Sequence, residues 1–222
     1  RSSSVAFDPR SSAREFAIIV TEVGMAQLVP PVIAHLEKQG PGLRLKAMPL
    51  DSRPIEARLQ AGEADVVLGV FPSVSANMRR QRLYTDTYMS VVRKSHPRAG
   101  KLTKPEAFLR ERHVVVTSSP TGHGVHQALE RIFATKLDPD RVHVRVPSFV
   151  TSAMVASKTD AVGTLPARLA QYLADDLKLT PFATPLPLPR IEICQFWHER
   201  VQQDAGHRWF RGTLRTLFGS KD

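Results

Sequence analysis

Short apolar runs alternate, in the first third of the chain, with stretches whose apolar residues recur every three or four positions. The apolar runs predict buried strands over 15–21, 44–50 and 65–70. The periodic stretches predict helices over 25–39 and 54–62, the second with a proline in its first turn and a glycine at its end. This alternation is typical of a parallel sheet with helices packed on its faces, so the predicted fold class is α/β.

Two adjacent prolines, Pro30 and Pro31, interrupt the first predicted helix. Proline has no N–H group to donate within a helix, and its ring crowds the preceding turn. We therefore expect this helix to bend at the prolines or to start late.

The alternation breaks after residue 71 and then resumes. Two strand-like runs, near 80–84 and 87–93, follow each other with no helix between them. The patterns beyond them predict helices at 104–110, 123–135, 150–158 and 166–175, and strands at 113–117, 142–146, 161–165 and 191–198. The second half of the chain is therefore a second α/β unit.

The C-terminal segment DAGHRWFRGTLRTLF is predicted to be an amphipathic helix. It places five large apolar residues on one helical face: Trp209, Phe210, Leu214, Leu217 and Phe218. Since the first unit has no closing helix of its own, we expect this helix to return to it. Two lobes are thus predicted, residues 1–80 with 200–222 and residues 81–199.

Small, hydroxyl and glycine residues follow the predicted strands, at 21–25, 50–52, 71–72, 118–123 and 147–151. Ligands of open α/β sheets bind beyond the carboxyl ends of the strands, where helix N-termini present free N–H groups. These loops are therefore the predicted binding site.

The loop SSPTGHG (118–124) is compatible with three kinds of site. Catalysis by Ser118 or Ser119 is disfavoured, because no G-x-S-x-G motif is present and no acidic residue stands nearby to orient His123. Zinc is disfavoured, because His123 and His126 have no further ligand at a supporting spacing. We therefore expect no catalytic residue, no metal site and no cofactor.

Ligand binding accounts best for the same loop. Gly122 and Gly124 let the backbone approach a ligand closely. Ser119 and Thr121 can cap the following helix or donate hydroxyl groups, and His123 can donate a hydrogen bond to an acceptor. The plain alternative is that the loop is only a well-capped helix start.

Composition narrows the class of protein. The chain has 222 residues, 42% apolar and 23% charged, which is typical of a globular protein. We find no membrane-spanning segment and no secretory signal, and a single cysteine excludes an internal disulfide, so a cytoplasmic location is expected. The formal net charge of +10 is spread along the chain, which disfavours a direct nucleic-acid groove.

Several stretches resemble the effector-binding domain of LysR-type transcriptional regulators. They are FDPRSSAREFAIIVTEVG, LQAGEADVVLGVFP, LYTDTYMSVVRKSHP and AVGTLPARLA, and the resemblance covers about residues 7–218. TGHG (121–124) and FWHERVQQDAGHRWFR (196–211) resemble the branch that holds regulators of naphthalene/salicylate and nitrotoluene breakdown and the nodulation regulators.

The resemblance implies a fold like the type 2 periplasmic binding proteins, with two Rossmann-like lobes joined by crossover strands and an effector in the cleft. Carried onto this sequence, the effector contacts are Thr21, Glu22, Gly24, Asp51, Ser52, Phe71, Ser119, Thr121 and His123. His123 resembles the histidine with which this branch holds an aromatic effector. Phe71, Phe149 and Trp197 are candidate walls for an aromatic ring, while Phe149 and Trp197 are equally compatible with ordinary core packing.

The resemblance also implies that the chain is part of a longer regulator. The expected effector is an aromatic acid or phenol, and DNA is expected to be bound by a winged helix-turn-helix domain that this chain lacks. A homodimer or homotetramer is expected, paired through the 25–39 helix and a neighbouring strand, with no membrane partner. The alternatives are an extracytoplasmic solute-binding protein of the same fold and an enzyme that uses the cleft.

Overall fold

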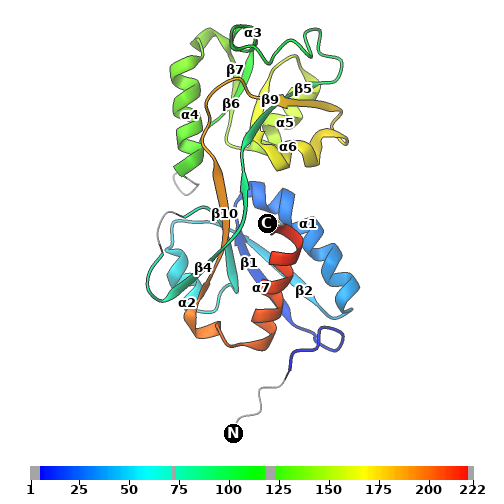
Figure 1. The fold of residues 1–222 in the computed structure, drawn as a ribbon, viewed down its shortest axis with the longest axis vertical. Coiled ribbons are helices and arrows are strands. Elements are labelled where there is room, and N and C mark those ends of the chain that lie inside the picture. The colour runs from blue at the N-terminus through cyan, green and yellow to red at the C-terminus, as the bar shows by residue number, and fades with distance from the viewer. Residues whose placement is uncertain (1–5, 72–73, 119–123, 220–222) are drawn as a thin grey trace. The chain divides into compact units, whose positions relative to one another are not determined.

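The computed structural model describes residues 6–71, 74–118 and 124–219, and the chain forms two compact units (Figure 1). Unit 1 comprises Arg1–Tyr84 and Glu192–Asp222, and unit 2 comprises Thr85–Ile191. The chain passes between them along strand β4 (Met78–Asp86) and at the start of strand β10 (Ile191–His198). The sequence predicted lobe boundaries after residues 80 and 199, whereas the units of the structure change after residues 84 and 191.

Unit 1 is built on a five-stranded sheet in the order β2-β1-β3-β10-β4. Its parallel strands are β1 (Glu15–Val20), β2 (Arg44–Pro49) and β3 (Val66–Gly69). Strand β10 pairs antiparallel with β3. Because β1, β2 and β3 run in the same direction, the loops that follow them lie at one edge of the sheet.

The helices of unit 1 are α1 (Glu22–Gln39), α2 (Ile55–Gln60) and α7 (Ala205–Phe218), with a 3-10 turn η2 (Glu199–Val201) before α7. Helix α7 contributes Phe210, whose ring stacks on that of Phe16 in β1 with the centroids 4.4 Å apart. Helix α1 buries Leu28 and Leu36 in the same core. Burial of each such side chain contributes about 1.5–3 kcal/mol, and this holds both helices against the sheet.

Helix α1 excludes the late start that was one of the two expected effects of the prolines. It begins at Glu22 and continues through Pro30 and Pro31 to Gln39. Each proline in a helix interior costs about 3 kcal/mol. The buried side chains of α1 offset this cost, so tertiary packing overrides the local signal that the prolines give.

Unit 2 contains a three-stranded sheet, β8-β5-β9, and a separate pair, β6-β7. The strands are β5 (Tyr88–Arg93), β6 (His113–Val116), β7 (Val142–Val146), β8 (Gly163–Pro166) and β9 (Leu179–Ala183). Strand β6 is parallel to β7, and a parallel bridge joins His113 to Val162 just before β8. Strands β6, β7 and β8 therefore share a direction, with their amino ends at one side of unit 2 and their carboxyl ends at the other.

Helices lie on both sides of the strands of unit 2, with α4 on one side and α6 on the other in the view of Figure 1. The helices are α3 (Pro105–Arg110), α4 (Gly124–Lys136), α5 (Phe149–Lys158) and α6 (Ala167–Ala174), with a 3-10 turn η1 (Pro139–Arg141) before β7. Helix α5 packs against β8 through small residues, because a Cβ on Gly163 would stand 3.3 Å from the carbonyl oxygen of Ser152. Among the described residues, none forms a helix long and apolar enough to cross a bilayer.

Candidate functional site

Five predicted residues lie together at the carboxyl edge of the sheet in unit 1. Thr21 and Glu22 follow β1, Asp51 and Ser52 follow β2, and Phe71 follows β3. Thr21 caps α1, since its hydroxyl oxygen accepts a hydrogen bond from the backbone N–H of Gly24 at 3.4 Å. The adjacent parallel strands thus gather these side chains where an α/β sheet holds its ligands.

Gly24 has a packing role in addition to its predicted place at the site. A Cβ at this position would stand 3.1 Å from the Cβ of Val20 in β1. This separation is tighter than ordinary van der Waals contact, so a side chain here would push α1 away from the strand. The close approach of α1 to β1 is sufficient to account for this glycine.

Asp51 is held by arginines of its own unit. Its carboxylate accepts hydrogen bonds from the backbone N–H of Arg53 at 2.9 Å and from the Arg53 guanidinium at 2.6 Å, and Arg58 lies 3.5 Å away. The Arg53 side chain, with help from the Arg58 charge, lowers the pKa of Asp51. The sequence analysis missed Arg53, which is 56% exposed and places a cation at this edge. An arginine three residues after the predicted strand over 44–50 was the available signal.

Phe71 and Trp197 have different surroundings within unit 1. The half-buried Phe71 ring contacts Phe196 edge-on, with centroids 5.1 Å apart. Trp197 is only 7% exposed, its indole N–H donates to Gln202 at 2.6 Å, and the Arg211 guanidinium lies 4.5 Å from its ring centroid. We therefore assign Trp197 to the core of unit 1, which was the alternative role considered for it.

An aromatic cluster lies at the carboxyl edge of unit 2 and consists of Tyr88, His126 and Phe149. The Tyr88 hydroxyl is 2.7 Å from Nδ1 of His126, which fixes the imidazole. The Phe149 centroid lies 4.8 Å from that of His126 and 6.5 Å from that of Tyr88. Burial, with a smaller contribution from the Asp86 charge, raises the pKa of Tyr88, so its phenol is neutral at physiological pH.

The sequence analysis predicted Phe149 but missed the partners of this residue. Tyr88 and His126 are 38 positions apart, and the antiparallel pairing of Tyr88 with Pro166 at the end of β8 brings the tyrosine to this edge. The sequence signal for Tyr88 was an aromatic residue at the start of a strand, and such a residue does not indicate which side chains it will contact.

Ser118 ties the end of β6 to helix α4. Its backbone N–H and its hydroxyl both donate to Oε2 of Glu130 at 2.7 Å. These two bonds lower the pKa of Glu130, and a carboxylate with a lowered pKa is a weak base. Ser118 is therefore held as a structural donor, and Glu130 is poorly suited to activate it as a nucleophile.

The predicted contacts Ser119, Thr121 and His123 lie outside the described residues. Within the described part of the chain, no group of three or more His, Cys, Asp or Glu side chains is placed to hold a metal ion. Cys194 is buried in unit 1, and burial raises the pKa of its thiol to about 11, so it is mainly protonated at neutral pH.

Comparison with known proteins decides the family. Residues 9–219 match the LysR substrate binding domain family. The chain belongs to this family. The regulatory domain of MexT, a transcriptional activator in Pseudomonas aeruginosa, has the same fold with a TM-score of 0.72 and 22% identity, over 93% of this chain and 99% of that one. The predicted LysR-type family and the periplasmic-binding-protein-like α/β fold are confirmed.

Curated relatives of this LysR domain are transcriptional regulators. The HTH-type transcriptional regulator LinR of Sphingobium indicum is 28% identical over 97% of this chain and 70% of its own length. The HTH-type transcriptional activator NagR of Ralstonia sp is 30% identical over 96% of this chain and 69% of its own length. Nodulation protein D 1 of Rhizobium tropici is 26% identical over 94% of this chain and 67% of its own length, in keeping with the predicted branch.

The chain is thus the effector-binding domain of a LysR-type transcriptional regulator, a family whose members bind small effectors and DNA and form oligomers. These relatives favour regulation over the alternative of an extracytoplasmic solute-binding protein.

Proposed function

We propose that this LysR domain senses a small aromatic acid or phenol, which binds at the carboxyl-end loops of the strands and is released chemically unchanged. The observation that supports this is the aromatic cluster of Tyr88, His126 and Phe149, in which a fixed imidazole stands beside two rings. Aromatic faces pack favourably against a ligand ring. Helices α4 and α5 both start at this edge, and the positive end of a helix dipole favours a carboxylate or phenolate.

The carboxyl-end loops of unit 1 carry polar groups for this proposal. The Arg53 guanidinium is 56% exposed and bonded to Asp51 and Glu63, so a ligand carboxylate would pair with it by replacing one of these partners, while Thr21 and Ser52 provide hydroxyl groups. Glu22, Phe71, Ser119, Thr121 and His123 complete the proposed contacts. In this proposal Gly24 lets α1 approach β1 closely, and Asp51 orients Arg53.

Signal transmission requires that the effector favours one arrangement of the two units over another. A ligand with equal affinity for two states shifts neither, so the effector must bind one arrangement more tightly. In the full-length regulator this shift repositions paired DNA-binding domains on their half-sites. The proposed assembly is a cytoplasmic homodimer or homotetramer that pairs through α1 and a neighbouring strand. No turnover of the effector is expected.

A thermal-shift screen of aromatic acids, phenols, sugars and amino acids tests this proposal. A ligand at 100 times its dissociation constant adds about 2.7 kcal/mol of stability, or about 5–10 °C for a chain of this length. At least one aromatic acid or phenol is expected to give such a shift, and His123→Ala is expected to reduce it.

Tyr172→Ala is the control, because Tyr172 is 47% exposed on α6 and lies outside the proposed contacts. It should leave the shift unchanged. Stabilisation by sugars or amino acids alone would contradict the aromatic effector. Conversion of the ligand during incubation, seen by chromatography and lost in His123→Ala, would contradict a sensor without catalysis.

A further inference from the structure

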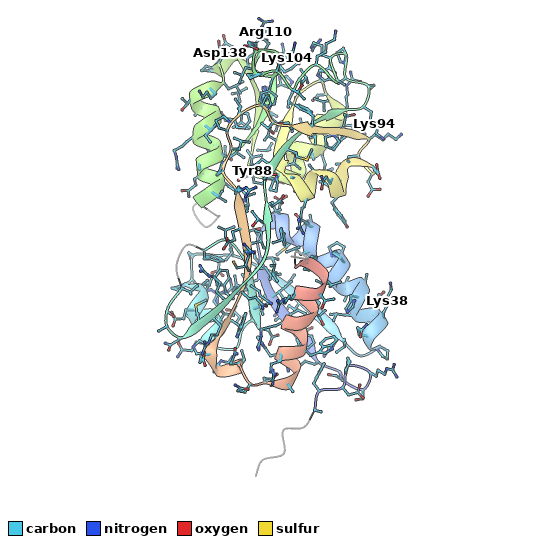
Figure 2. All side chains as sticks on the ribbon, in the orientation of Figure 1. Lys38, Tyr88, Lys94, Lys104, Arg110 and Asp138 are labelled. Carbon is cyan, nitrogen blue, oxygen red and sulfur yellow. The ribbon has the colours of Figure 1, made fainter. Side chains whose placement is uncertain are left out.

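A pocket separate from the proposed effector site lies at the amino ends of the parallel strands of unit 2. It has a volume of about 550 Å³. Its walls come from the segment after β5, from helix α3 and the residues before β6, from the start of β7, and from the residues before β8. Figure 2 labels Arg110 at this end of unit 2 and Tyr88 at the other end. The volume falls in the range of pockets that hold small organic ligands.

Six basic side chains line this basic pocket, which we define by Arg98, Lys101, Arg110, Arg112, Arg141 and His143. Two acidic residues, Glu111 and Asp160, also line it. With histidine neutral, the five Lys and Arg side chains outnumber the two carboxylates, which leaves a net charge of +3. Such an excess in one concave wall attracts anions.

Both carboxylates are already occupied by cations. Glu111 is buried, and its Oε2 accepts a hydrogen bond from Nη2 of Arg98 at 3.0 Å. Asp160 accepts a hydrogen bond from Nε of Arg93 at 2.7 Å, and Arg93 stands outside the pocket lining. The acidic residues therefore hold the pocket in shape and leave its other cations unneutralised.

Four of the basic side chains that line the pocket are not paired with a carboxylate in the described part of the chain. Within the described ranges, the side chains of Lys101, Arg110, Arg112 and Arg141 make no hydrogen bond or ion pair, and all four residues are exposed. Like charges that share a small volume repel each other, and a bound anion removes that repulsion. The guanidinium group pairs well with phosphate and carboxylate oxygens because its donors form a planar fork.

Apolar side chains also line the pocket. Leu102 is 1% exposed and Ala161 is 2% exposed. A concave wall that combines apolar and cationic groups suits a compact organic ion better than a long polymer. We propose that the basic pocket is a second ligand site of this regulator, which binds a small organic molecule that carries two or more phosphate or carboxylate groups.

Isothermal titration of the 222-residue protein with pyrophosphate, citrate and acetate, at fixed ionic strength and pH 7.5, tests this proposal. Saturable binding of pyrophosphate or citrate is expected, with acetate much weaker because it carries a single charge. Tighter binding of pyrophosphate would indicate a phosphorylated ligand, and tighter binding of citrate would indicate a polycarboxylate. No saturable binding of either would overturn the proposal.

A double variant, Arg110→Gln with Arg112→Gln, localises the binding. Both side chains are exposed and unpaired, so the variant should fold normally, and its affinity should fall about tenfold or more. The matched control is Lys94→Gln with Lys158→Gln, which removes the same charge from exposed positions of unit 2 outside the pocket. The control should bind within about twofold of the original protein, because only general screening changes.

An equal loss of affinity in the two double variants would show that net charge alone is responsible, and this would overturn a built site. Random duplex DNA that binds more tightly than the small anions, and that depends on Arg110 and Arg112, would also overturn it. The pocket would then be a contact for a nucleic-acid backbone.

Discussion

The two ends of the parallel strands in unit 2 carry opposite kinds of surface. At the carboxyl end, Tyr88, His126 and Phe149 touch one another, and their polar atoms are engaged. At the amino end, Arg110 and Arg112 are exposed and unpaired among the described residues. Removal of a packed side chain costs folding free energy, whereas removal of an exposed charge costs little. Substitutions at the proposed site of the carboxyl end are therefore expected to change stability as well as ligand binding, whereas those at the proposed site of the amino end are expected to change binding alone.

Phe149→Ala tests this coupling with the largest expected effect. The side chain is 5% exposed at the start of α5, and truncation of a buried phenylalanine costs about 3–5 kcal/mol. Urea unfolding followed by circular dichroism measures the change in the free energy of unfolding. Met154→Ala on the same helix is the control, because Met154 is 52% exposed and should change that free energy by less than about 0.5 kcal/mol. Equal losses in the two variants would show that the aromatic cluster is not packed.

His113 sharpens the comparison, because it is a buried group at the amino end. It is fully buried at the start of β6, and its Nε2 lies 2.7 Å from the carbonyl oxygen of Phe108. Burial lowers the pKa of His113 from 6.5 to about 4. Between these values the unfolded chain binds a proton that the folded protein does not, so acid favours unfolding. The contribution of His113 is complete above pH 6.5 and is lost as the pH falls to about 4, a change of about 3 kcal/mol.

Urea unfolding at several pH values from 7.5 to 4 measures this dependence. His113→Gln is the reference, because its amide nitrogen can keep the bond to the Phe108 carbonyl while the titrating group is removed. Burial also lowers the pKa of His207, so the difference between the two pH profiles, rather than either profile, reports His113. Parallel profiles would show that His113 takes up its proton normally in the folded state.

The basic pocket at the amino end is a feature that could not be predicted from the sequence. Apolar periodicity predicted strands β1, β2 and β3 and the loops after them, because each signal lies within about ten neighbouring residues. The basic residues looked scattered along the sequence, yet Arg98, Arg112 and Arg141 line one pocket. Their proximity follows from the order of the strands and from the parallel bridge at His113, which no local pattern encodes.

The roles of single aromatic side chains could not be predicted from local sequence patterns either. Trp197 and Phe149 both follow or end apolar runs, and nothing nearby in the sequence separates a pocket wall from a core residue. For Trp197 the deciding partners are Gln202 and Arg211, the second of which comes from α7. The predicted contacts Ser119, Thr121 and His123 stay predictions.

Helix caps give the smallest expected effect, and here the two ends of unit 2 differ again. Ser148 caps α5 at the carboxyl end, with its hydroxyl oxygen 2.9 Å from the backbone nitrogen of Thr151. Ser148→Ala should lower the free energy of unfolding by about 1 kcal/mol, because a backbone donor loses its partner. Ser148→Asp should restore most of the loss. Chemical denaturation at pH 7 measures both variants, and no loss in Ser148→Ala would show that water replaces the cap fully.

Helix α3 lies at the amino end, and its N-cap residue is Lys104, whose side chain makes no capping hydrogen bond. The backbone there has φ −92° and ψ 133°, the extended geometry that a capping serine adopts. Lys104→Ser should therefore raise the free energy of unfolding by about 0.5 kcal/mol, since it supplies an acceptor to the first turn. Lys94→Ser, at an exposed position of the same unit directly after β5, is the control for loss of charge. A gain confined to Lys104→Ser would show that the amino end lacks stabilising bonds that its backbone is already shaped to accept, whereas the carboxyl end has them in place.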